Sequence, residues 1–476
     1  MSHLVPRHLN DLHASIADNS DLIYPHTASA LHPKAATAEA QDKVPDPTLF
    51  ASLTQPTRGD SDLPTVGECA VHLELLEVFH KLRINVIRSS ALDTTFGVRI
   101  EKRAVFQRGW DDAKRDYVMK PGHLKDETWG SRRRQKWSYF LEIAVGRFRV
   151  WIGKMDWFLK ALGLEDRTRL PYLPPLDVLM VWHAFLLNPR DYDQACRRDS
   201  LTYVAALRFP WEAVHAAINR RDWKYTQPKA SADWTQERAN MEPDLFQFLG
   251  WAGKPSNGLS AALARYGVQP KAPIFSLDEA LDTQGLNSRD AAFLAMLRQG
   301  ELDKEANGLL VANVQRQAAF VDKMHAQLWI RSPALEGTLR RAGDRYDKFL
   351  RLFKLCPGQR LVPTLDIDLV WHTHQCSAAA YRASVEQRTG VFLNHDDKLG
   401  QPVLKVELER TRRPFFVHFG EDYEKCFCWE CEMIASVLED DDANGQQESL
   451  STLTERVRVN VEYHRCVEIL RRPPAL

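Results

Sequence analysis

The chain has 476 residues, of which 44% are hydrophobic and 26% charged, a composition typical of a globular protein with one to three domains. Its 63 basic and 63 acidic residues cancel, which excludes a dedicated nucleic-acid binder with a large basic surplus. The chain lacks an apolar run of about 18 residues, a signal-peptide core in its first twenty residues, and the cysteine density of a disulfide scaffold. We therefore expect a cytoplasmic protein without a membrane partner.

The predicted elements begin after a polar N-terminal segment. Residues 1–60 are rich in Ala, Pro, Ser, Thr, Asp and His without a sustained period, so we expect a disordered or loosely docked arm. Thr65-Val-Gly-Glu68 has the spacing of a capping box and predicts the start of a helix. Helical periodicity then covers residues 137–162, 177–187, 190–199, 277–300, 305–331 and 334–354.

Few strands are expected, so the predicted fold class is mainly α. Short strands are predicted at Val86–Arg88 and Gly97–Glu101. Near the end of the chain, Thr452-x-x-Glu455 predicts the cap of a last helix that runs to about Arg471.

Composition divides the chain into four parts. A run with several Pro, Gly and Ser residues around Gly253–Pro273 and the acidic run Glu439–Ser449 mark the boundaries. The predicted parts are the arm at 1–60, a first helical half at 61–260, a second helical half at 270–438, and an acidic linker with a C-terminal helix at 439–476.

An internal repeat relates the two predicted halves. Pro174-Pro-Leu-Asp-Val-Leu-Met-Val-Trp-His183 matches Pro363-Thr-Leu-Asp-Ile-Asp-Leu-Val-Trp-His372, and the register continues to Tyr192 and Tyr381. Upstream, Phe158-Leu159 also corresponds to Phe349-Leu350 after a two-residue difference in length. We interpret the match as an internal duplication that gives two related helical halves.

Each copy is predicted to be a helical hairpin that carries a Trp-His pair. Asp177 and Asp366 are expected to cap the first helix of each hairpin, and Asn188 and Ser377 to cap the second. Gly390 is expected to end the second helix of the second copy.

The second copy carries additional polar residues. Asp368 and His372 are four residues apart and share a helix face, where the carboxylate could orient the imidazole or both could bind one metal. His374 lies on another side of the same helix. The first copy has Leu179 and Phe185 at the positions of Asp368 and His374, so a site would belong to the second half. The alternative is that Trp and His only anchor each hairpin.

Asn394-His-Asp-Asp-Lys398 is the second polar motif. His395-x-Asp397 has the spacing of two arms of a facial triad for non-heme iron, and His418 or His464 would supply the distal ligand. The alternative is a polar loop whose carboxylates cap a helix or pair with Lys398.

A cysteine cluster forms the third motif. Cys426, Cys428 and Cys431 could supply three thiolates to one zinc, with a histidine or Cys466 as the fourth ligand. The alternatives are buried thiols without a ligand or a redox-reactive cluster.

Together these motifs resemble the glycine-rich domain-containing protein-like family of fungi and plants. The resemblance rests on the helix Cys69–Leu76, the two Trp-His motifs, Asn394–Lys398 and Cys426–Glu432, and it covers about residues 65–435. It implies a short, fungal-type member without the RNA-recognition-like region and glycine-rich tail of plant members, and an association with specialised metabolism. It supplies no catalytic residues, and RNA binding is not carried over.

Two functions remain open on the sequence alone. The first is a small-molecule enzyme whose cleft is lined by the side chains Asp368, His372, His374, His395 and Asp397. Such a site would use a divalent metal, zinc or iron, or His372 as a general base. The second is a non-catalytic scaffold that binds a protein, with Cys426, Cys428 and Cys431 as a structural metal clip.

Overall fold

The computed structural model describes residues 25–54, 62–101, 103–163, 168–254, 259–260, 263, 287–395, 401–444 and 449–471. Within these ranges the protein is mainly helical, with two small antiparallel sheets, so the predicted fold class is confirmed. No described helix is both long enough and apolar enough to span a bilayer.

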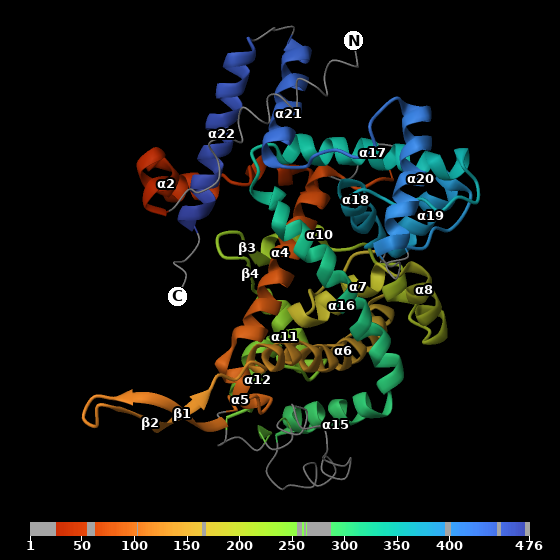
Figure 1. Cartoon of the computed structure of the whole chain (residues 1–476). Helices are drawn as coiled ribbons and strands as arrows, with labels where there is room; N and C mark the ends of the chain where they lie inside the picture. Colours follow the sequence, from red (N-terminus) through yellow and green to blue (C-terminus); the bar gives the residue numbers. More distant parts are fainter. Residues whose placement is uncertain are drawn as a thin grey trace.

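Helix α4 (Val66–Arg88) runs through the middle of the molecule (Figure 1). It begins with the predicted capping box, in which Thr65 Oγ1 accepts the Glu68 N–H at 3.2 Å and the Glu68 carboxylate accepts the Thr65 N–H at 2.8 Å. Most of its side chains are buried, because it contacts helices from both the N-terminal and the C-terminal regions. Both regions therefore share one core along α4.

Further helices pack around the core that contains α4. They are α5 (Ser90–Thr95), α6 (Trp129–Leu162), α9 (Thr202–Ala205), α10 (Trp211–Ala217), α11 (Lys229–Glu237), α12 (Leu245–Ala252), α15 (Ser288–Leu302), α16 (Lys304–Gln327), α17 (Leu335–Leu355), α20 (Gln401–Phe419) and α21 (Trp429–Asn444). The predicted helix at 277–300 is described only from Ser288, and its earlier residues lie outside the described ranges. The predicted helix at 305–331 ends at Gln327, since Leu328 takes a left-handed conformation with φ 49° before the 3-10 turn η3 (Trp329–Arg331).

Residues 25–54, part of the arm expected to be disordered or loosely docked, form four short helical elements. These elements are α2 (Pro25–Leu31), η1 (Pro33–Ala36), α3 (Ala38–Asp42) and η2 (Pro47–Thr54). The first three elements pack on the C-terminal helix α22 (Leu450–Arg471), with His32 Nε2 2.9 Å from a Glu462 oxygen. The surface that orders this segment lies 430 residues away in sequence, so local composition could not indicate it.

Helix α22 begins earlier than predicted. Ser449, rather than Thr452, is the capping residue, because its hydroxyl accepts the Thr452 N–H at 3.2 Å.

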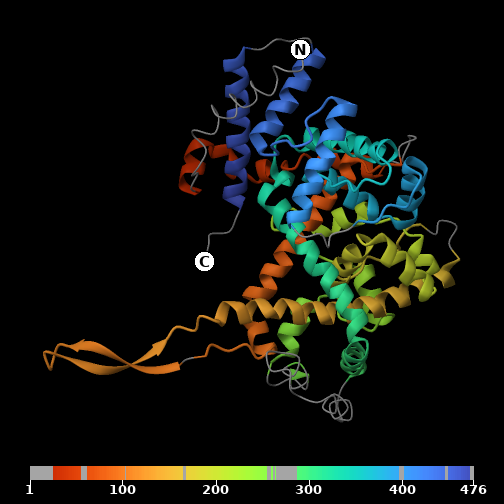
Figure 2. The same cartoon turned by 45° about the vertical axis from the view of Figure 1, so that its right-hand side comes forward.

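The strand predictions were wrong. Val86–Arg88 form the last turn of α4, where the long helical run outweighs a short β-branched one, and Gly97–Glu101 are not extended strand. The described strands are instead β1 (Arg103–Asp111) and β2 (Asp116–Leu124), a hairpin that projects from the helical body (Figures 1 and 2), and the short pair β3 (Ile218–Asn219) and β4 (Lys224–Tyr225).

The two Trp-His motifs lie on α7 (Leu176–Leu186) and α18 (Leu365–Gln375). Each is followed by a second helix, α8 (Pro189–Arg198) or α19 (Ala378–Thr389). Asn188 and Ser377 occupy the predicted N-cap positions of these second helices, although neither side chain makes a capping hydrogen bond. Gly390 ends α19 in the left-handed conformation, with φ 80°.

The sequence predicted that Asp177 and Asp366 are N-caps, and this was wrong. Helices α7 and α18 begin one residue before them. Each carboxylate instead pairs with a buried arginine of a long helix: Arg147 of α6 lies 2.7 Å from Asp177, and Arg345 of α17 lies 2.6 Å from Asp366. A buried charge requires such a partner, so these pairs fix α7 on α6 and α18 on α17.

Aromatic contacts recur around the two helices. Trp182 contacts Trp151 with ring centroids 5.7 Å apart, and Trp371 contacts Phe349 at 5.6 Å. In these contacts the partner of Trp182 is Trp151, and not the Phe158 that the sequence matched with Phe349. Two further contacts around α7 have counterparts around α18. The Phe148–Phe185 contact corresponds to Tyr346–His374, and the Phe185–Tyr192 contact corresponds to His374–Tyr381.

Candidate metal centre

Three donor atoms converge at the side of α18. Asp368 and His372 project from the same face of the helix, and His395 reaches them from the segment that follows α19. The His372 Nε2–His395 Nε2 distance is 3.2 Å, His395 Nε2 lies 3.2 Å from Asp368 Oδ1, and His372 Nε2 lies 3.3 Å from the same oxygen. The i, i+4 pair expected from sequence is thus joined by the predicted His395.

These distances fit three ligands of one ion. With metal–ligand bonds of about 2.1 Å, donor atoms at this spacing subtend an angle of about 100° at a common centre, close to tetrahedral or octahedral values. Two imidazoles and one carboxylate form a facial donor set used by iron and zinc sites.

Burial places the three groups at different depths. The side chain of His372 is 1% exposed, that of His395 10% and that of Asp368 21%, so the carboxylate lies nearest the surface. Burial lowers the pKa of His372 to about 4. For Asp368, burial raises the pKa, but the neighbouring His372 and His395 lower it by a larger amount, so the net shift is downward. Neutral imidazole and ionised carboxylate are the forms that bind metal.

His374 does not join the group. Its Nδ1 lies 3.0 Å from the Tyr346 hydroxyl, and its ring packs edge-on against Tyr346 and Tyr381. Burial lowers its pKa to about 3, so the neutral ring accepts the hydrogen bond of the tyrosine. Its place in the core corresponds to the anchoring alternative.

The other residues of the expected triad have different outcomes. Asp397 lies outside the described residues. His464 is held within α22, where its Nδ1 lies 2.9 Å from the Asn460 carbonyl oxygen, and His418 lies beside Phe419 at the end of α20. Among the described residues, Asp368, which the sequence paired with His372, is the carboxylate that lies next to His395.

A second pair of histidines was missed by the sequence analysis. His72 of α4 places Nε2 2.8 Å from His183 Nε2 and Nδ1 2.8 Å from the Thr373 hydroxyl. That hydroxyl donates to the Leu369 carbonyl, so His72 Nδ1 must donate to it, and His183 Nε2–H must then donate to His72 Nε2. The only local signal for this role was a histidine within the apolar run Cys69–Leu76.

The three cysteine sulfurs also converge. Cys426 Sγ and Cys428 Sγ are 3.4 Å apart, the Cys431 N–H donates to Cys428 Sγ at 3.5 Å, and the three sulfurs all lie within 4.8 Å of one another. Thiolates of one tetrahedral zinc would be about 3.8 Å apart. Cys466 is buried against α2 and η1 in a separate small core, so the structure does not bring it into this cluster.

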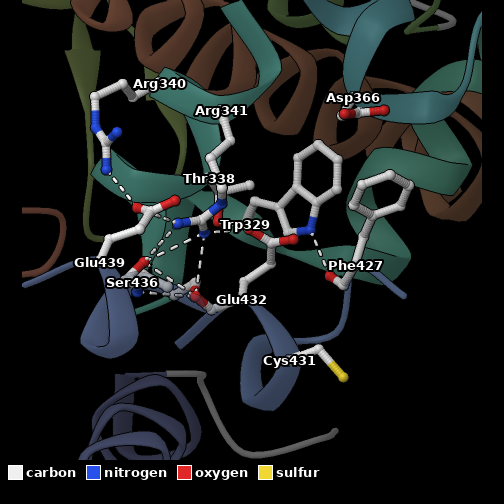
Figure 3. A network of polar contacts seen from close by, with 12 residues as sticks. Trp329, Thr338, Arg340, Arg341, Asp366, Phe427, Cys431, Glu432, Ser436 and Glu439 are labelled. Carbon is white, nitrogen blue, oxygen red and sulfur yellow. Dashed lines mark hydrogen bonds and ion pairs between the residues drawn. The ribbon is translucent and has the colours of Figure 1, made fainter. Parts of the chain in front are cut away.

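Two tryptophans hold the cysteine segment in place. Trp329 Nε1 donates to the Phe427 carbonyl and Trp429 Nε1 donates to the Gln327 carbonyl, both at 2.9 Å. Figure 3 shows how a network next to this segment ties α21 to α17: Arg341 pairs with Glu432 and Glu439, and Thr338 donates to Glu432. These hydrogen bonds and ion pairs hold the backbone around the cysteines against α17 and the turn η3.

Comparisons with known proteins agree with these motifs. Residues 281–383, which include Asp368 and His372, match the family model "Glycine-rich domain-containing protein-like". Glycine-rich domain-containing protein 1 of Arabidopsis thaliana is 24% identical over 276 residues, 56% of this chain and 26% of the relative. Glycine-rich domain-containing protein 2 is 25% identical over 233 residues, 48% and 22% respectively.

The chain thus spans about a quarter of the length of the curated relatives it matches. No solved structure matches it. Through residues 281–383, the chain is therefore similar to the glycine-rich domain-containing protein-like family.

Proposed function

We propose that this protein is a metal-dependent enzyme that binds one divalent ion, zinc or iron, through Asp368, His372 and His395, and acts on a small molecule. The observation that carries the proposal is the near-equilateral triangle of donor atoms with edges of 3.2–3.3 Å. Three protein ligands leave coordination positions for water or substrate, whereas structural zinc sites use four protein ligands. The bound ion would supply Lewis-acid chemistry.

The roles of the three residues follow from their depth. His372 is held at the base by burial and by the Phe320 ring, whose centroid is 4.4 Å away, so it fixes the position of the ion. Asp368 lies on the side of the site that is nearest the surface. There its negative charge would attract the cation, and its side chain would lie next to the substrate. His395 closes the triangle from a different segment, which makes cation binding depend on the fold of α19.

The two helical regions, we infer, arose by internal duplication, and only the second acquired the site. The matched aromatic contacts and the two Arg–Asp pairs support this origin. In the first region Leu179 replaces the carboxylate, and His183 Nε2 is engaged by His72. The expected place in fungal specialised metabolism and the cytoplasmic location stay predictions.

The test is elemental analysis of the purified chain after incubation with zinc or ferrous iron and removal of loose ions. Asp368→Leu, which introduces the residue of the first region, should lose one ion per chain. The control His374→Phe also introduces the first-region residue, but it lies outside the triangle and should keep that ion. Equal metal content in Asp368→Leu and the unchanged protein would refute the proposal.

A second candidate is a structural zinc on Cys426, Cys428 and Cys431, which would suit a binding scaffold. The observation in its favour is that the sulfurs converge on a backbone already fixed by Trp329 and Trp429. Cobalt substitution separates the two sites, because only thiolate ligands give an intense sulfur-to-cobalt absorption band. Cys428→Ala should abolish this band, and Asp368→Leu should leave it unchanged. Metal lost only with Cys428→Ala would favour the scaffold over the enzyme.

A further inference from the structure

One face of the β1–β2 hairpin is aromatic and exposed. The strand register pairs Phe106 with Pro121 and Trp110 with Tyr117, and places these side chains on the same face as Met119. Phe106 is 69% exposed, Met119 61%, Tyr117 55% and Trp110 48%. Figures 1 and 2 show the hairpin extending away from the helices in both views, so the body of the protein does not cover this face.

The base of the hairpin is anchored. Asp126, just after β2, accepts the Glu101 N–H at 2.9 Å, and Arg132 at the start of α6 pairs with Asp126. Arg132 also donates to the Arg99 carbonyl at 2.8 Å. The two ends of the hairpin are thereby tied to each other and to a long helix, which holds the aromatic face at a fixed position.

The side chains of this face are arranged for contact. The Trp110 and Tyr117 rings meet edge-on with centroids 5.3 Å apart, and the Arg108 guanidinium lies 5.2 Å from the centre of the Tyr117 ring. Aromatic residues, Met and Arg are the types enriched at the cores of protein interfaces. An isolated two-stranded hairpin is marginally stable in water, so covering the face would also stabilise it.

The charges of the hairpin differ between its tip and its base. Residues 111–116 at the tip carry three Asp against Lys114 and Arg115. Residues 99–103 and 121–134 around the base carry seven Lys or Arg against Glu101, Asp126 and Glu127. Two such hairpins laid antiparallel would bring each acidic tip to the basic base of the other.

We propose that a second copy of this chain docks on the aromatic face, with the two hairpins antiparallel about a two-fold axis near Arg108 and Met119. In this arrangement Phe106 of each copy packs on Trp110 of the other, because the two residues lie equally far from Arg108. Such an isologous contact is the commonest kind in dimers. The separation of charge between tip and base matches a second, antiparallel copy, whereas an anionic membrane would attract the basic base and repel the acidic tip.

The first experiment measures the mass of the full chain by sedimentation equilibrium over a range of concentrations. The unchanged protein should dimerise, and Phe106→Glu should raise the dissociation constant by about 30-fold or more. Gln107→Glu adds the same charge on the opposite face of the hairpin and should leave the constant unchanged. Higher salt should weaken the dimer, since the tip-to-base attraction is screened. A monomeric unchanged protein, or a dimer unaffected by Phe106→Glu, would overturn the proposal.

A second experiment tests the geometry. Met119→Cys should be linked to the same position of the second copy by a short bismaleimide reagent, identified by the mass of the linked peptides, because Met119 lies near the axis and packed sheet faces lie about 10 Å apart. Val118→Cys faces the other side and should not. Binding of a monomeric unchanged chain to vesicles of phosphatidylserine and phosphatidylcholine, lost in Phe106→Glu, would assign the face to membranes and refute the dimer.

Discussion

Helices α7 and α18 present the same Trp-His pair in different surroundings. Both histidines are buried, at 2% exposure for His183 and 1% for His372, and both place Nε2 next to a second imidazole. For His183 that neighbour is His72, whose Nδ1 is hydrogen-bonded to the Thr373 hydroxyl. The position that corresponds to Asp368 is Leu179, which has no carboxylate. For His372 the neighbour is His395, and Asp368 completes a triangle.

This difference shows that the surroundings of a buried histidine determine its chemistry. Around α7, the hydrogen-bond chain fixes a proton on His183 Nε2, which prevents this nitrogen from binding a cation. Around α18, three atoms with lone pairs face one point, and a carboxylate provides negative charge. The shared Trp and Asp residues serve packing in both regions, while the residues that differ determine the site.

The largest expected effect comes from breaking the buried Arg–Asp ion pair that occurs once in each region. Asp177→Ala and Asp366→Ala each leave a buried guanidinium without its partner, so the free energy of unfolding should fall by about 3–5 kcal/mol in both variants. Urea denaturation measures the change. Arg198→Ala, at an exposed pair on α8, should change it by less than about 0.5 kcal/mol. A large loss in only one region would break the equivalence of the two.

Acid should act on the α7 region through His183. Burial lowers its pKa to about 3, whereas an unfolded histidine titrates near 6.5. The native state therefore binds fewer protons between these values, and its stability, complete above pH 6.5, should fall by about 1.4 kcal/mol per pH unit below it for this group.

The matched variant is His183→Gln, whose amide can still donate to His72 but does not titrate. Urea denaturation at several values between pH 6 and 4 gives the free energy of unfolding as a function of pH. For His183→Gln this dependence should correspond to about one proton fewer than for the unchanged chain. An unchanged slope would mean that His183 is not held neutral in the folded protein.

The smallest effect is expected when the α18 core is converted to that of α7. His374→Phe alone leaves the buried Tyr346 hydroxyl without an acceptor and should reduce the free energy of unfolding by about 1–3 kcal/mol. Adding Tyr346→Phe recreates the Phe148–Phe185 contact and should restore it to within about 1 kcal/mol. A double-mutant cycle in denaturant measures the coupling. Additive losses would show that the two cores are not interchangeable.

Local signals predicted much of the helical fold. The features that were predicted depend on residues within four positions of one another or on a single backbone conformation. They are the capping box at Thr65 and Glu68, the left-handed helix end at Gly390, and the helix face shared by Asp368 and His372. Such features are determined by helix geometry, and the sequence states them directly.

Long-range partners could not be predicted. His72 and Thr373 are 301 residues apart, and nothing in either segment indicates the other. The sequence offered both Asp368 and Asp397 as carboxylates for a metal, and spacing alone gave no account of how the segment after α19 returns to α18. The Arg–Asp pairs were missed for the same reason, since the packing of α6 and α17 selects the arginine.

The central position of α4 has a consequence for synthesis on the ribosome. This helix is made early, yet it contacts α16, α17 and α18, which emerge roughly 240–300 residues later. At about 5–20 residues per second, one side of α4 lacks its partners for about 12–60 s. Its apolar side chains and the polar His72 would then face solvent or a chaperone, so the rate of translation through the intervening segment should influence the yield of folded protein.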